Sequence, residues 1–221
     1  MLYQCALGMA MIWPAFCQPP LTPNQMEELN ANLEAAHELS LGALARPSHP
    51  ERPSNESISV ARLKHRAPKQ AKKALRSAAK LSQAGEHEKA IAQLKSAVLR
   101  DPDFIDAHDL LALECARLGR YSEARPSMQR VVDLDPDYFG GHYNLGVILV
   151  ELGDLSAAER SARRALQLSG SNPLAHLLMG YLLCTRQESR AEGILHLQYA
   201  ARTLSQARNF LEQLKVSGAV Q

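Results

Sequence analysis

Two consecutive stretches of equal length decide the fold: IDAHDLLALECARLGRYSEARPSMQRVVDLDPDY (105–138) and FGGHYNLGVILVELGDLSAAERSARRALQLSGSN (139–172). Aligned without a gap, they place His108 over His142, Gly119 over Gly153 and Ala124 over Ala158. The same spacing extends each of these three matches along the chain: Gly85, Gly119 and Gly153; Ala90, Ala124 and Ala158; His108, His142 and His176. A fixed period of this length indicates stacked structural repeats.

The composition of each unit predicts a pair of packed helices. Aromatic residues make up only 5% of the chain, and abundant Ala and Leu favour helices over strands. Small residues recur where a first helix must approach a second one closely: Ala78, Ala112, Gly146 and Gly180. We expect the recurring glycines Gly85, Gly119 and Gly153 to end the first helices in a left-handed conformation. One helix pair cannot bury its apolar face alone, so stacking must supply the core.

This pattern resembles the tetratricopeptide repeat (TPR) family, whose signature has the form W-x2-L-G-x2-Y, then A-x3-F, A and P. In the second copy the matching residues are His108, Leu111, Ala112, Cys115, Gly119, Ala124, Met128, Val131 and Pro136. The resemblance implies an all-α protein, an α-solenoid of about four helix-turn-helix repeats in residues 68–221. The expected repeats are about 71–104, 105–138, 139–172 and 173–204, with a C-terminal capping helix at 205–217. The fourth copy slips by one residue, so that Gly193 takes a second-helix position.

The composition of the whole chain excludes several classes of protein. Its 221 residues are 46% hydrophobic and 22% charged with a net charge of +2, as in an ordinary globular protein rather than a disordered or collagen-like one. The longest apolar run is interrupted by Pro14 and is shorter than the roughly 20 residues of a spanning helix, which excludes a polytopic membrane protein. The four cysteines form no CxxC pair, so no disulfide framework is indicated.

The sequence before the repeats divides into two tracts. Residues 1–17 form an apolar leader that we interpret as a signal peptide with Ala15-Phe16-Cys17 at its cleavage site. Export to the periplasm is favoured over a cytoplasmic location, although the leader has no Lys or Arg; the alternative is a disordered leader on a cytoplasmic protein. Residues 18–67 read as a mostly disordered Pro/Ser-rich linker ending in a basic neck, with one short β-like segment, ISVARL, at 58–63.

The basic neck is the strongest signal outside the repeats. Residues 61–80 contain eight Lys and Arg and no acidic residue. Such a cluster attracts anionic surfaces, and we therefore keep an anionic-surface binder, with a nucleic acid or a membrane as its partner, as the alternative function. No aromatic side chain lies among the basic ones to stack on bases, which favours a membrane surface over a nucleic acid.

No motif in the chain indicates catalysis, a metal or a cofactor. Phosphate loops, GxSxG elbows and HExxH pairs are absent from the sequence. His108, His142 and His176 lie one repeat apart, too far for a shared zinc ion whose ligands are all about 2 Å away. We interpret them as core or rim residues, and Cys184 as a packing residue without a neighbouring histidine in the sequence.

The resemblance implies binding of a protein partner, a peptide or a helix, in a concave groove lined by the first helices. Carried over by register, the expected groove residues are Lys72, Leu75, Asp106, Asp109, Leu113, Tyr143, Val147, Val150, Leu174, Leu177 and Tyr181. One end is cationic, the middle acidic and the far end apolar with two tyrosines that suit an anchor residue. The alternative for Leu113, Val147 and Leu177 is packing against neighbouring repeats. The sequence therefore predicts a non-catalytic interaction scaffold.

Overall fold

The structure, a computed structural model, describes residues 60–216, and over that range it is all-α. Its α-helices are α2 (Val60–Lys64), α3 (Lys69–Gln83), α4 (His87–Arg100), α5 (Ile105–Arg117), α6 (Tyr121–Leu134), α7 (Phe139–Glu151), α8 (Leu155–Leu168), α9 (Pro173–Cys184), α10 (Arg190–Ala201) and α11 (Ser205–Val216). A short 3-10 helix, η1 (Gln187–Ser189), precedes α10. The predicted leader and most of the predicted linker lie outside the described residues.

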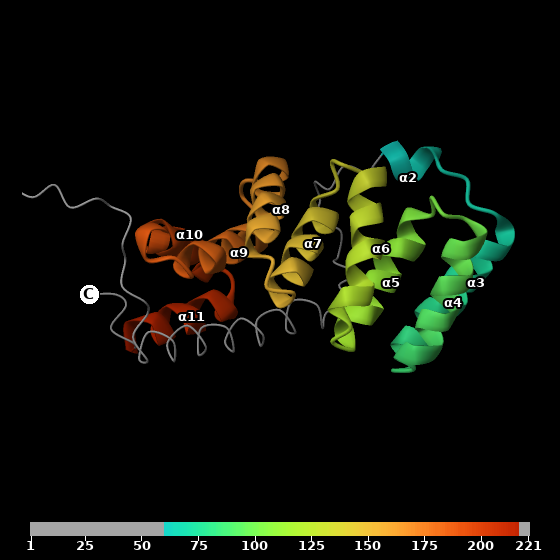
Figure 1. The fold of residues 1–221 in the computed structure, drawn as a ribbon, viewed down its shortest axis with the longest axis horizontal. Helices are drawn as coiled ribbons and strands as arrows, with labels where there is room; N and C mark the ends of the chain where they lie inside the picture. Colours follow the sequence, from blue (N-terminus) through green and yellow to red (C-terminus); the bar gives the residue numbers. More distant parts are fainter. Residues whose placement is uncertain (1–59, 217–221) are drawn as a thin grey trace, which may run out of the picture.

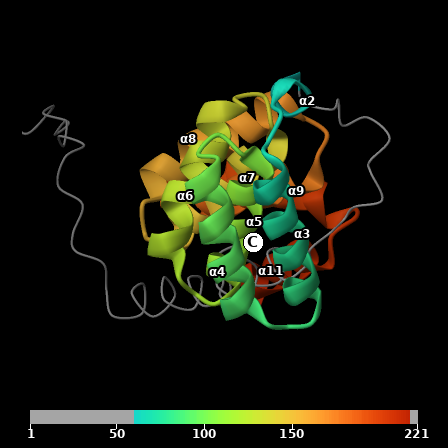
Figure 2. The same ribbon diagram turned by 90° about the vertical axis from the view of Figure 1, so that its right-hand side faces the viewer.

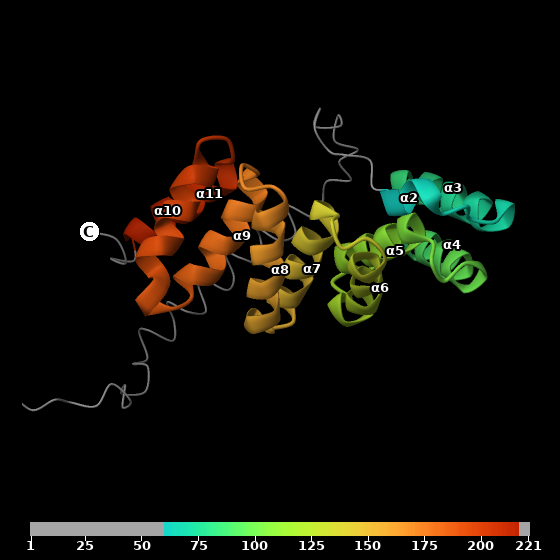
Figure 3. The ribbon, with the colours of Figure 1, turned by 90° about the horizontal axis from the view of Figure 1, so that it is seen from above.

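The helices from α3 to α10 form four consecutive pairs, and α11 follows as a single terminal helix. The pairs succeed one another along the long axis of the molecule (Figures 1 and 3), and the view down that axis superimposes them (Figure 2). The predicted α-solenoid of four helix pairs with a capping helix is therefore confirmed. No helix between residues 60 and 216 is both long and apolar enough to cross a membrane.

Glycines end the first helix of the first three pairs, as the sequence predicts. Gly85, Gly119 and Gly153 have φ angles of 77°, 72° and 74°. In the first pair the amide of Glu86 donates to the carbonyl of Leu81 at 2.9 Å, and the same bond closes the other two turns. This arrangement satisfies carbonyls that the end of a helix would otherwise leave without partners.

Each of the three later pairs is tied to the loop before it by its repeated histidine. His108 donates through Nε2 to the carbonyl of Pro102 at 3.0 Å, and His142 to that of Pro136 at 2.9 Å. In the fourth pair His176 donates to the carbonyl of Gly170 at 2.9 Å. The recurring histidines thus make a repeated hydrogen bond between the first helix of a pair and the chain entering it.

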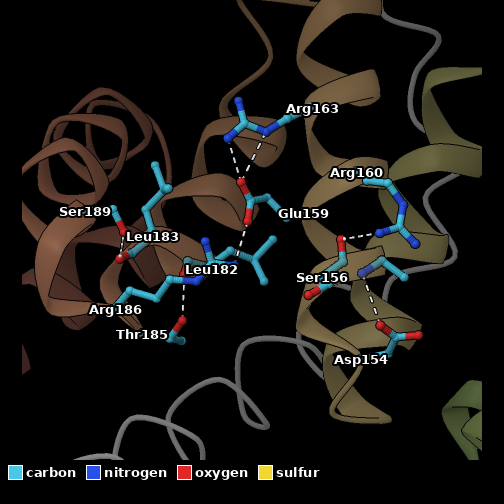
Figure 4. A network of polar contacts seen from close by, with 11 residues as sticks. Asp154, Ser156, Glu159, Arg160, Arg163, Leu182, Leu183, Thr185, Arg186 and Ser189 are labelled. Carbon is cyan, nitrogen blue, oxygen red and sulfur yellow. Dashed lines mark hydrogen bonds and ion pairs between the residues drawn. The ribbon is translucent and has the colours of Figure 1, made fainter. Parts of the chain in front are cut away.

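The fourth pair differs from the others in the turn between its helices. Thr185 and Ser189 donate to the carbonyls of Leu182 and Leu183 at 2.6 and 2.8 Å, so the longer turn with η1 is satisfied locally (Figure 4). Just after α9, Arg186 reaches back to Glu159 of α8 at 2.7 Å. That carboxylate also accepts from Arg163 (Figure 4). The longer turn agrees with the predicted slip of one residue and is fixed to the preceding repeat.

The neck departs from the expectation for residues 58–63. We interpret ISVARL as β-like, but residues 60–64 form the helix α2. The interpretation is wrong because an alternating pattern of six residues is too short to distinguish a strand from one and a half turns of helix. α2 packs beside the start of α5, where Arg62 contacts Asp106, instead of pairing with a strand.

Candidate interaction surface

The predicted groove residues fall on the first helices α3, α5, α7 and α9, and their surroundings change along the solenoid. At the N-terminal end, Lys72 and Leu75 of α3 line a cavity of about 310 Å³ together with Asp106 of α5. Lys72 and Asp106 are exposed and Leu75 is half-buried. The structure therefore brings three of the predicted residues to one hollow, where a cation, an anion and an apolar side chain are all accessible.

The remaining lining of this cavity comes from α2 and from both sides of the first inter-repeat contact. Its other members are Arg62, His65, Ala67, Arg76, Phe104 and Ile105. Phe104 and Ile105 are buried and form an apolar floor. The rim is mainly cationic, because α3 contributes Lys72 and Arg76 and carries no acidic residue.

In the acidic middle of the groove, Asp109 is already bonded to other side chains of the same protein. Asp109 accepts from Arg62 of α2 at 3.2 Å and from the hydroxyl of Tyr138 at 3.2 Å. Burial raises the pKa of Asp109, although the Arg62 guanidinium acts in the opposite direction. This carboxylate is held in an internal network, whereas Asp106, which also contacts Arg62, keeps 49% of its side chain exposed.

The apolar end of the groove is buried. Tyr143, Val147, Val150, Leu177 and Tyr181 are each between 4% and 7% exposed, whereas Leu113 and Leu174 are half-buried. Tyr143 stacks on Phe139 with ring centroids 6.1 Å apart, and Tyr181 packs on Phe210 of α11 at 5.8 Å. These contacts make the two tyrosines part of the packing of the solenoid.

Buried polar groups join neighbouring repeats. Glu114 of α5 is completely buried and accepts from Ser82 at 2.8 Å and from His87 at 2.7 Å. It therefore connects α5 to the end of α3 and the start of α4. A buried carboxylate needs such partners, because desolvation without them is costly.

The described cysteines are buried, and two of the described histidines contact each other. Burial raises the pKa of the Cys115 and Cys184 thiols to about 11, so both are protonated at neutral pH. His196 of α10 lies with its Nδ1 2.8 Å from Nδ1 of His176. Within residues 60–216 no group of three or more His, Cys, Asp or Glu side chains is placed to hold a metal ion.

Sequence reasoning missed the contacts of α2 and the pair His176–His196. Arg62 was counted only as one cation of the basic neck and His65 was not singled out, and their carboxylate partners lie at least 36 residues later. The one signal in the sequence was electrostatic, since a basic neck precedes repeats that carry Asp101, Asp106 and Asp109. The pair His176–His196 was missed because no other repeat has a histidine at the position equivalent to His196.

Comparison with known proteins agrees with this geometry. The profile of the family described as "Tetratricopeptide repeat" matches residues 80–139 and, in a second overlapping match, residues 110–173. This chain is a tetratricopeptide repeat protein. No curated protein sequence matches it.

Solved structures share the TPR fold at low sequence identity. TTC0263, a thermophilic TPR protein of Thermus thermophilus, is 22% identical with a TM-score of 0.55, over 67% of this chain and 83% of that one. MamA from Desulfovibrio magneticus RS-1 is 16% identical with a TM-score of 0.56, over 70% of this chain and 96% of that one. MamA MSR-1 is 20% identical with a TM-score of 0.55, over 82% and 97%. At these identities the likeness establishes the fold alone.

Proposed function

We propose that this TPR protein is a non-catalytic scaffold that binds a peptide or helix of a protein partner on the face formed by its first helices. The observation that carries the proposal is the hollow of about 310 Å³ between α3 and α5, with Lys72, Leu75 and Asp106 at its surface. A pocket that combines an apolar floor with a few polar groups suits an anchored side chain.

The two ends of the predicted groove have different roles in this proposal. The accessible end, at α3 and α5, receives the partner directly. The buried tyrosines of α7 and α9 pack inside the solenoid, and Leu113 and Leu174 are half-buried. Substitution of Tyr143 or Tyr181 would therefore remove core packing as well as any contact with a partner.

Site-specific photocrosslinking tests the face that binds. A photoreactive amino acid is placed in the full chain at Lys72 or Arg76 on α3, and at the exposed Gln93 of α4 or Gln129 of α6 as matched controls. We expect α3 positions to capture a defined partner, identified by mass spectrometry, and the second-helix positions not to. Capture only from α4 and α6 would contradict the proposed face.

A second candidate function, binding to an anionic membrane, is favoured by one specific observation. Five exposed cations lie on one face of α3, because the last four follow the first by 3, 4, 7 and 11 residues: Lys69, Lys72, Lys73, Arg76 and Lys80. The test is co-sedimentation with phosphatidylcholine vesicles that contain or lack phosphatidylserine. Binding that requires phosphatidylserine and is lost in Lys73→Glu/Lys80→Glu would support this candidate, and equal binding to both vesicles would exclude it.

A further inference from the structure

The helix α2 places one guanidinium into a site that three elements of the solenoid build. Arg62 Nη1 lies 3.1 Å from Asp106 Oδ1, and Nη2 lies 3.2 Å from Asp109 Oδ2. Its Cζ lies 4.1 Å from the centroid of the Tyr138 ring, and Nε lies 3.8 Å from Asp135 Oδ2. A planar cation with a fork of donors is thus held by carboxylates at its edges and an aromatic ring against its face, the geometry that distinguishes arginine from lysine.

The walls of this site come from the repeats themselves. Asp135, at the end of α6, is 4% exposed, and its Oδ2 has no hydrogen-bond partner. Tyr138 lies close to the first turn of α7, where a Cβ on Gly140 would come within 2.6 Å of its hydroxyl. That glycine allows the ring to lie where it both faces Arg62 and donates to Asp109.

Arg62, which occupies this site, belongs in contrast to a helix outside the repeat pairs. α2 is five residues long, and two polar contacts join it and the residue that follows it to the repeats. One is made by Arg62 and the other by His65, which donates through Nε2 to Asp101 Oδ2 at 2.7 Å. Arg62 and Asp106 keep 26% and 49% of their side chains exposed, so water has access to this ion pair and weakens it.

We propose that Asp106, Asp109, Asp135 and Tyr138 form an arginine-binding pocket, that a partner protein inserts an arginine side chain there, and that Arg62 of α2 is the internal competitor for it. The inference rests on the proposed function, because the pocket adjoins the hollow at α3 and α5 and shares Arg62 and Asp106 with it. Asp109 and Asp135 keep only 14% and 5% of their side chains exposed, and leaving buried carboxylates without a cation is costly, so a second guanidinium is a favoured replacement whenever Arg62 leaves.

The experiment uses the full chain and a fluorescent peptide with the sequence of residues 58–67, ISVARLKHRA, as the arginine probe. Binding is measured by fluorescence anisotropy to the wild-type chain and to Arg62→Ala, whose pocket no longer holds a guanidinium. We expect the variant to bind the peptide at least tenfold more tightly than the wild type. The control peptides replace the arginine at the position of Arg62 with lysine or alanine, and both should bind the variant more weakly than the arginine peptide.

Two further variants keep the test decisive. Arg62→Ala/Asp109→Asn should lose the gain in peptide affinity, because the pocket then lacks its central charge. His65→Ala removes only the second contact, so it should also bind the peptide more tightly than the wild type, and it decides the question if circular dichroism shows Arg62→Ala to be unfolded. Equal peptide affinity for the wild type and the folded variants would overturn the pocket.

The result of the peptide experiment can be distinguished from the result of the test of the proposed function. A partner captured from α3 whose affinity does not change in Arg62→Ala would overturn the competition and leave the scaffold function intact. Conversely, peptide binding that follows the expected order would support the pocket even if photocrosslinking placed the partner on the second helices.

Discussion

Gly180 of α9 and Gly193 of α10 lie where the two helices cross at close range. A Cβ on Gly180 would lie 2.7 Å from Leu197 Cγ and 2.9 Å from the carbonyl oxygen of Gly193. The second contact is with backbone, which cannot move aside as a flexible side chain can. Gly180 belongs to the series of small residues that recurs once in each repeat, and at this position of the fourth repeat a single methyl group is too large.

We predict that Gly180→Ala lowers the free energy of unfolding by about 2 kcal/mol or more, because overpacking forces the helices apart. The measurement is urea denaturation followed by circular dichroism. Gly170→Ala is the control, since a Cβ at this exposed site would meet only the carbonyl of Leu166 at 3.4 Å, and a change within about 0.5 kcal/mol is expected there. Equal losses in both variants would contradict the close crossing.

The buried thiols give a second prediction at this scale. Because burial raises the pKa of Cys115 and Cys184 to about 11, their thiolate fraction at pH 7.5 is very small. Iodoacetamide should leave both unmodified in the folded protein and modify both in urea, as measured by peptide mapping with mass spectrometry. Rapid modification of either residue in the folded chain would show that its surroundings differ from this structure.

At the scale of elements, α5 is bonded to the first helix pair through Glu114. Since Ser82 and His87 both donate to its buried carboxylate, removal of that group leaves their bonds unmade and a cavity behind. The exposed pair Glu88–Arg120 also bridges the first and second repeats, which provides a matched comparison between a buried and a surface contact.

Glu114→Ala should therefore destabilise the protein by about 3 kcal/mol, whereas Glu88→Ala should cost less than about 1 kcal/mol. Thermal and urea unfolding of both variants measure the difference. Losses of similar size would mean that Glu114 does not hold α5 against the first pair.

The histidines between α9 and α10 predict a pH dependence. His176 donates to a carbonyl through Nε2, so in its neutral form Nδ1 accepts from His196. Burial, followed by His176, lowers the pKa of His196, and burial lowers that of His108 and His142 as well. The folded chain binds these protons less readily than the unfolded one, for which histidine has a pKa of about 6.5.

Stability should thus be fully present above that value and fall as the pH drops through it. We expect the melting temperature to decrease between pH 8 and pH 5.5, with a smaller decrease in His196→Phe. A melting temperature that rises over this interval, or the same decrease in the variant, would contradict the assigned contact.

Elements with repeated neighbours were predictable, and those without were not. The sequence period located the glycines that end α3, α5 and α7, because each repeat solves the same packing problem. α2 has no counterpart in the other repeats, and its helix is fixed by Arg62 and His65 contacting carboxylates far along the chain. The local sequence pattern around Arg62 and His65 does not indicate which distant carboxylates they contact.

At the scale of the whole molecule, some features of the candidate site were predictable from the repeat pattern and others were not. The repeat register predicted that Lys72, Leu75 and Asp106 lie on first helices, and in the structure they line one hollow. The repeat register alone did not indicate that Asp109 is already bonded to Arg62 of α2 or that Tyr181 packs on Phe210 of α11, because both contacts come from helices outside the four pairs. Nor did it indicate that Tyr143 is buried. The account's central claim is that the accessible part of the first-helix face, at α3 and α5, receives a protein partner.

Hydrogen exchange resolved by peptide, on the full chain alone and saturated with the partner captured from α3, tests that claim most directly. We predict slower exchange in peptides from α3 and α5 when the partner is bound, with α4 and α6 unchanged. Protection confined to α4 and α6, or a saturated complex with no protection on α3 and α5, would contradict it.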